Sequence, residues 1–201
     1  MKTFSQTISA ILHPAFVPLL GFLLLYYISG DALYLPPNIF WFTLLIIFQF
    51  TILIPFSILY FLYRIKKVSD FYLSKREERP LPLILTLISY AISYAIFRYF
   101  HYPHIIVSFF ATVVIATAFS MFVSFTYKIS LHSIAWGAVS GLCLALAYRY
   151  HIELHFIVSI SFIISAIVAL SRLFLDAHKP AEIYTGWASS FSLALYIMTF
   201  F

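Results

Sequence analysis

The chain has 201 residues, of which 63% are hydrophobic, 20% are aromatic and only 9% are charged. This composition excludes a water-soluble globular protein, because a soluble surface of that size needs many more charged side chains. The formal net charge of +5 is modest, and no dense basic run with interleaved aromatic residues indicates nucleic-acid binding. We therefore expect an integral membrane protein in contact with membrane lipids.

The sequence contains a series of apolar runs, each close to the length of about 20 residues that a helix needs to cross the hydrocarbon core. In chain order they lie at residues 8–29, 39–63, 81–100, 104–126, 131–149, 154–172 and 184–201. The runs are long and continuous rather than short and alternating, which favours helices over the strands of a barrel. The sequence predicts an all-α bundle of six or seven transmembrane helices, with residues 1–201 forming a single membrane domain.

The first run is the least regular. His13, Pro14 and Pro18 interrupt it, so the helix could begin later or lie partly in the membrane interface. Between the runs, only residues 31–37 and 66–80 form loops of any length.

Three polar segments stand out between the later runs: KREERP at 75–80, KISLH at 128–132 and SRLFLDAHKPAE at 171–182. Two apolar runs separate each from the next, so all three should face the same side of the membrane. With seven helices, that side also carries the N-terminus and these ten cations: Lys2, Arg64, Lys66, Lys67, Lys75, Arg76, Arg79, Lys128, Arg172 and Lys179. The other side carries Arg98 and Arg149. We expect one polar pocket, assembled from three helix ends.

The segment at 171–182 has a pattern suited to phosphate chemistry. His178 and Glu182 are four residues apart, so on one helical turn they share a face and the carboxylate can orient the imidazole. Arg172 lies six residues before the histidine. A fixed cation and an oriented histidine provide an anion site and a nitrogen nucleophile. The alternative is a solvated turn between two membrane helices.

The other polar features also have simple structural readings. The segment at 75–80 is compatible with an ordinary positive-inside loop. His132, at the start of an apolar run, could cap its helix and contact lipid headgroups. Gly137 and Gly141 form a small-residue face of the kind that most often packs helices together.

Four histidines lie in the two short turns expected on the opposite side: His101, His104, His151 and His155. The last two have the spacing of metal ligands on a helix, but no third ligand accompanies them. A haem or metal protein using these histidines is a minor alternative. Cys143, inside an apolar run, is the single cysteine of the sequence, which excludes a disulfide within the chain and a cysteine-based metal cluster.

Together, the three polar segments resemble the three signature motifs of the type 2 phosphatidic acid phosphatase superfamily, membrane-embedded relatives of the vanadium haloperoxidases. The third motif of that family consists of serine and arginine, five residues, histidine, three residues and aspartate. Ser171, Arg172 and His178 match it at the right spacing, and Glu182 stands where the aspartate is expected.

The first two motifs are less complete. The second reads Pro-Ser-Gly-His in the family, and this chain matches it at Ser130 and His132. The first has a lysine, six residues and then Arg-Pro. Arg79 and Pro80 match it, and Tyr72 takes the position of the lysine. The resemblance covers residues 72–182.

The resemblance implies a division of catalytic roles. His178 would attack phosphorus and form a phosphohistidine intermediate, while Glu182 orients it. His132 would protonate the leaving group and then activate water. No metal or other cofactor is required.

The resemblance also implies a phosphate clamp. Arg79 and Arg172 would hold the phosphoryl oxygens, and Ser130 would donate a hydrogen bond. Lys75 or Lys128 could fold back to supply the cation missing from the first motif.

We therefore expect a membrane phosphatase that removes a terminal phosphate from a lipid monophosphate or diphosphate, such as phosphatidate, phosphatidylglycerol phosphate or a polyprenyl diphosphate. The alternative is a lipid-phosphate binding or transport protein, weak or inactive in catalysis, on the same scaffold. The excess of cations on the motif side predicts that this side faces the cytoplasm, in a bacterial inner membrane.

Overall fold

The computed structural model describes residues 2–201, which form helices and contain no strand. The α-helices are α1 (Lys2–Ile11), α2 (Val17–Ser29), α3 (Pro37–Ile47), α4 (Ile54–Arg64), α5 (Pro80–Tyr99), α6 (His104–Ser124), α7 (Leu131–Tyr150), α8 (His155–Phe174) and α9 (Pro180–Phe200). Three short 3₁₀ turns, η1 (Pro14–Phe16), η2 (Gly30–Leu33) and η4 (Arg76–Glu78), and one π-helical turn, η3 (Phe48–Leu53), complete the described elements.

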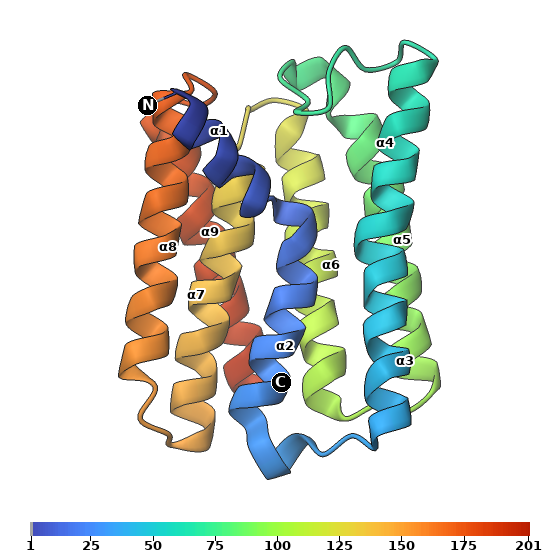
Figure 1. Ribbon diagram of the computed structural model, residues 1–201, viewed down its shortest axis with the longest axis vertical. Coiled ribbons are helices and arrows are strands. Elements are labelled where there is room, and N and C mark those ends of the chain that lie inside the picture. The colour runs from blue at the N-terminus through green and yellow to red at the C-terminus, as the bar shows by residue number, and fades with distance from the viewer. Residues whose placement is uncertain (1) are drawn as a thin grey trace.

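The predicted bundle of membrane helices is confirmed. Six helical spans in the described part of the chain are long and apolar enough to cross a membrane: Lys2–Ser29, Pro37–Arg64, Arg76–Tyr99, His104–Ser124, Leu131–Tyr150 and His155–Phe174. The seventh long helix, α9, has 21 residues and packs along α7, but it is less apolar than these six. Figure 1 shows the long helices side by side, with the N-terminus and the connections α4–α5, α6–α7 and α8–α9 at the same end.

The first expected span is divided at the position where the prolines occur. α1 ends at Ile11, and η1 connects it to α2. Ser5 and Ser9 on α1 are buried, and α1 packs against α8. α1 lies obliquely over the end of the bundle that carries the three polar segments (Figure 1). The N-terminal helix is therefore positioned to contribute to any site at that end.

The second span contains a π-helical turn that the apolar pattern does not predict. Pro55 has no N–H, so it cannot donate to the carbonyl groups of the preceding turn. Two hydroxyl groups of α5 donate to those carbonyls: Tyr90 Oη to Thr51 O at 3.4 Å and Ser89 Oγ to Phe50 O at 2.6 Å. These bonds satisfy buried backbone groups and join η3 to α5.

The most extensive helix packing in the described chain is between α7 and α9, which run in the same direction (Figure 1). A Cβ atom on Gly137 would lie 2.5 Å from the carbonyl oxygen of Trp187, and one on Gly141 would collide with the carbonyl oxygen of Phe191. The small-residue face of α7 is therefore a helix-packing surface, as the sequence analysis expected for Gly137 and Gly141. This close approach brings the first turns of α7 and α9 together.

Candidate functional site

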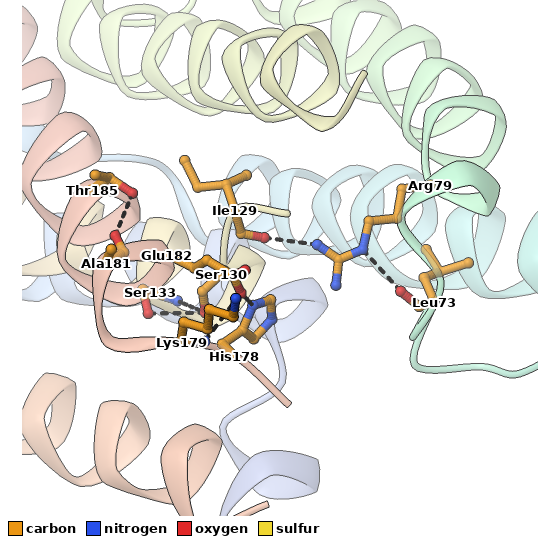
Figure 2. Close-up of polar contacts among 10 residues, drawn as sticks. All are labelled: Leu73, Arg79, Ile129, Ser130, Ser133, His178, Lys179, Ala181, Glu182 and Thr185. Atoms are coloured by element: carbon orange, nitrogen blue, oxygen red, sulfur yellow. Dashed lines mark hydrogen bonds and ion pairs between the residues drawn. The ribbon is translucent and has the colours of Figure 1, made fainter. Parts of the chain in front are cut away.

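The three polar segments meet at one end of the bundle, as the count of apolar runs predicts. Arg79, at the start of α5, donates from Nη1 to the carbonyl oxygen of Ile129 at 2.8 Å (Figure 2). The backbone N–H of Ser130 donates to the carbonyl oxygen of Glu182 at 3.2 Å. These two contacts join the α4–α5, α6–α7 and α8–α9 connections.

A cavity of about 200 Å³ lies next to these contacts. Its charged end is lined by His13, Tyr72, Arg79, His132, Arg172 and His178. The cavity continues between the helices, where its walls include Gly21, Phe109, Leu142 and Met198. It therefore combines a cationic end with an apolar interior.

His178 and Glu182 form a buried pair at the start of α9. The Nδ1 of His178 lies 2.7 Å from Oε2 of Glu182, which also accepts the backbone N–H of Lys179 at 3.2 Å (Figure 2). The expected contact between the two side chains is present, but His178 lies in the connection before α9 and Glu182 lies in the first turn of the helix. The positive end of the helix dipole stabilises the carboxylate there. With Nδ1–H donating to Glu182, Nε2 keeps its lone pair.

Burial lowers the pKa of His178 below its ordinary value, because the charged imidazolium is poorly solvated there. The hydrogen bond to Glu182 opposes this effect, and the charges of Arg79 and Arg172 reinforce it. The net lowering keeps the ring neutral at neutral pH, as a nitrogen nucleophile requires.

Arg79 holds two loops together while it lines the cavity. Its Nε donates to the carbonyl oxygen of Leu73 at 2.9 Å, and its Nη1 donates to that of Ile129 (Figure 2). The residue is only 3% exposed. Because a guanidinium has five N–H groups, up to three remain for a ligand.

Arg172, in the last turn of α8, is also buried. Its Nη1 donates to Oγ of Ser9 at 3.2 Å, and its Nε has no partner among residues 2–201. Within that range, neither Arg172 nor Arg79 forms an ion pair with a carboxylate. Unpaired buried cations are costly, so this end of the cavity is suited to an anion.

His132 is buried in the first turn of α7, where its Nε2 lies 3.1 Å from the carbonyl oxygen of Ser9. A carbonyl only accepts hydrogen bonds, so Nε2 carries a proton and Nδ1 of the neutral ring keeps its lone pair. Ser9 thus contacts both His132 and Arg172, one through its carbonyl and the other through its hydroxyl.

Three of the predicted phosphate-binding residues are not among the cavity walls. Ser130 is fully buried as the N-cap of α7, where its Oγ accepts hydrogen bonds from Ser133 N at 3.3 Å and Ser133 Oγ at 2.9 Å. Lys75 is exposed and pairs with Glu78 at 3.3 Å. Lys128 is half-buried in the α6–α7 connection. The cavity walls do include His178, His132, Arg79 and Arg172, and Glu182 contacts His178 from behind.

Two residues of the site were missed by the sequence reasoning, which treated the first run only as an irregular span. His13 lines the cavity, and Ser9 forms hydrogen bonds with two of the residues that line it, His132 and Arg172. The available signal was a histidine before a proline within an apolar run, because polar residues at such positions often line functional cavities.

At the opposite end of the bundle, His104 lies 3.2 Å from Oγ of Ser108 through its Nδ1. Residues 2–201 contain no group of three or more His, Cys, Asp or Glu side chains that could hold a metal ion. No family model, curated protein or solved structure matches this chain.

Proposed function

We propose that the chain is a membrane phosphatase that removes a terminal phosphate from a lipid monophosphate or diphosphate. The observation that carries this proposal is the grouping of two buried arginines, neither of which has a carboxylate partner within residues 2–201, around the cavity that His178 lines. Such an arrangement combines a phosphate clamp with an oriented nitrogen nucleophile. The family resemblance of residues 72–182 supports the same reading.

In the first step, Nε2 of His178 attacks phosphorus and the P–O bond to the lipid breaks, which gives a phosphohistidine. His132, protonated on Nδ1 as well as on Nε2 when the phosphate is bound, donates the Nδ1 proton to the departing lipid oxygen and becomes neutral. In the second step, His132 takes a proton from water, which attacks the phosphohistidine; the N–P bond breaks and inorganic phosphate leaves. Arg79 and Arg172 stabilise the charge on the phosphoryl oxygens, so no metal is needed.

The apolar interior of the cavity favours a substrate with a hydrocarbon tail. A phosphate held between Arg79 and Arg172 would leave its tail beside the interior walls, such as Phe109 and Leu142. Phosphatidate, phosphatidylglycerol phosphate and a polyprenyl diphosphate all have this chemistry, a phosphorylated head on an apolar chain.

A lipid-phosphate binding or transport protein is the second candidate. The observation that favours it is the composition of the cavity wall, where Tyr72 stands at the lysine position and neither Lys75 nor Lys128 is present. Such a protein would bind lipid phosphates without hydrolysing them.

The test is an assay of the purified full chain in detergent against a panel of lipid phosphates, with release of inorganic phosphate as the readout. We expect release from at least one of them, inhibition by vanadate and no effect of chelators, because the arginines supply the positive charge. Binding without release would favour the second candidate. Activity that disappears with chelator and returns with a divalent ion would contradict the metal-free mechanism.

We also propose that the motif end faces the cytoplasm of a bacterial inner membrane. It carries ten of the twelve cations, and five remain when Lys75, Arg79, Lys128, Arg172 and Lys179 are set aside as phosphate ligands. The opposite end has Arg98 and Arg149. A five-to-two excess favours the cytoplasmic side for the motif end.

A further inference from the structure

His13 is the one residue of the first span that brings a titratable ring to the charged end of the cavity. It is half-buried between α1 and η1. Its ring centroid lies 5.5 Å from that of His132, with the two planes nearly perpendicular. The same ring lies 5.5 Å from that of Phe56. The side chain is therefore held by packing on one side and faces the proposed reaction site on the other.

The hydrogen bonds of His13 determine which of its nitrogens can donate. Nδ1 accepts the backbone N–H of Ala15 at 3.2 Å, where His13 caps η1. In a neutral imidazole the proton then resides on Nε2. This N–H has no partner among residues 2–201, so it is a free donor at the cavity wall.

The cavity wall offers few donors besides the two guanidinium groups, each of which keeps some N–H groups free. Arg79 uses two N–H groups on loop carbonyls, and Arg172 uses Nη1 on Ser9. Hydroxyl groups deeper in the wall donate to carbonyls of their own helix, as Thr112, Thr117 and Ser120 do. No lysine lines the cavity. A bound phosphoryl group needs donors for three oxygens, and the free N–H of His13 is positioned to serve one of them.

We propose that His13 is a phosphate-binding residue, which donates from Nε2 to an oxygen of the phosphoryl group held by Arg79 and Arg172. This inference rests on the proposed function and deepens it, because it adds a donor from the N-terminal segment to a site otherwise built from residues 72–182. Ser9, one turn before His13, supports this arrangement because it holds both His132 and Arg172.

The competing explanation is that His13 only packs the corner between α1 and α2. Three substitutions separate the two roles. His13→Phe keeps an aromatic ring against Phe56 but has no donor. His13→Asn keeps an acceptor for Ala15 N–H but does not reach the position of Nε2. His13→Gln places an amide N–H near that position. His155→Phe, at an exposed position of the opposite end, is the matched control.

The first measurement is the rise in the thermal unfolding midpoint of each purified full-length variant in detergent when vanadate or inorganic phosphate is added. The second is KM and kcat for the lipid phosphate that the parent hydrolyses. A hydrogen bond to a charged group corresponds to roughly 10- to 100-fold in affinity. We expect His13→Phe and His13→Asn to weaken anion binding by about that factor and to raise KM, with recovery in His13→Gln and no change in His155→Phe.

Parent-like anion affinity in a folded His13→Phe or His13→Asn variant would overturn the proposal, as would a weakening that His13→Gln fails to reverse. The experiment distinguishes an error in the role of His13 from an error in the proposed phosphatase activity. If the parent binds vanadate through His13 but hydrolyses no lipid phosphate, only the phosphatase activity is lost. If the parent hydrolyses lipid phosphates and the His13 variants bind the anion equally well, only the role of His13 is lost.

Discussion

The free Nε2 of His178 and the occupied Nε2 of His132 predict different effects of removing each ring. Without His178 no phosphohistidine forms, so His178→Ala should abolish turnover of every substrate. In the first turnover, His132→Ala should release the leaving group about 10²- to 10⁴-fold more slowly from lipid phosphates but lose much less on nitrophenyl phosphate, whose leaving group needs no proton. Single-turnover rates of alcohol and nitrophenol release check this, with His155→Ala as control. Parent-like activity of His178→Ala would end the phosphohistidine mechanism.

The lowered pKa of His178 predicts the acidic limb of the pH profile. A nucleophile must be neutral, so activity is lost as the pH falls through its pKa. Because burial lowers that pKa, kcat/KM for nitrophenyl phosphate should persist below the ordinary histidine value of about 6.5. Glu182 raises the pKa of His178, so Glu182→Gln should move the acidic limb to lower pH and reduce the maximum rate. An acidic limb that moves to higher pH in Glu182→Gln would contradict this account.

At the scale of the helices, the packing of α7 on α9 positions the two histidine-bearing segments. Gly137→Ala would place a methyl group 2.5 Å from a carbonyl oxygen of α9, so the two helices must separate. We expect a loss of roughly 1–3 kcal/mol in the free energy of unfolding, together with lower activity. The thermal midpoint in detergent measures the effect. Ala188→Leu adds volume at an exposed position of α9 and should change little; equal effects of the two substitutions would show that this close packing is not important.

The helices themselves were predictable because apolar length is a strong signal, and the last six expected runs coincide with helices or continuous helical spans to within a few residues. The small face of Gly137 and Gly141 was also visible in the sequence. Two features of the fold were not visible in the sequence. The π-helical turn depends on hydroxyl groups of α5 that satisfy carbonyls beside Pro55, and the position of α1 depends on its packing against α8.

The site was predictable where sequence spacing fixes geometry and not where tertiary contact does. The pairing of His178 with Glu182 follows from four residues of separation at a helix start. Ser130 caps α7 and Lys75 pairs with Glu78, each through a contact between residues three apart, whereas the family resemblance led us to expect these side chains at the phosphate. In contrast, the contribution of Ser9 depends on a contact across more than 120 residues, which a local pattern does not encode.

At the scale of the whole molecule, an even number of membrane-spanning helices separates the three polar segments, so all three face the same side of the membrane. If the motif end is cytoplasmic, single cysteines at Lys67 and Glu153, both exposed and at opposite ends of the bundle, should differ in their access to an impermeant thiol reagent. In intact cells Glu153→Cys should be labelled, and Lys67→Cys should be labelled only after the membrane is opened. Both variants are made with Cys143, which is buried, replaced by serine.

The opposite pattern would place the site on the outer face, where it would act on lipid phosphates of the outer leaflet. The cation excess would then reflect the phosphate clamp rather than the positive-inside rule.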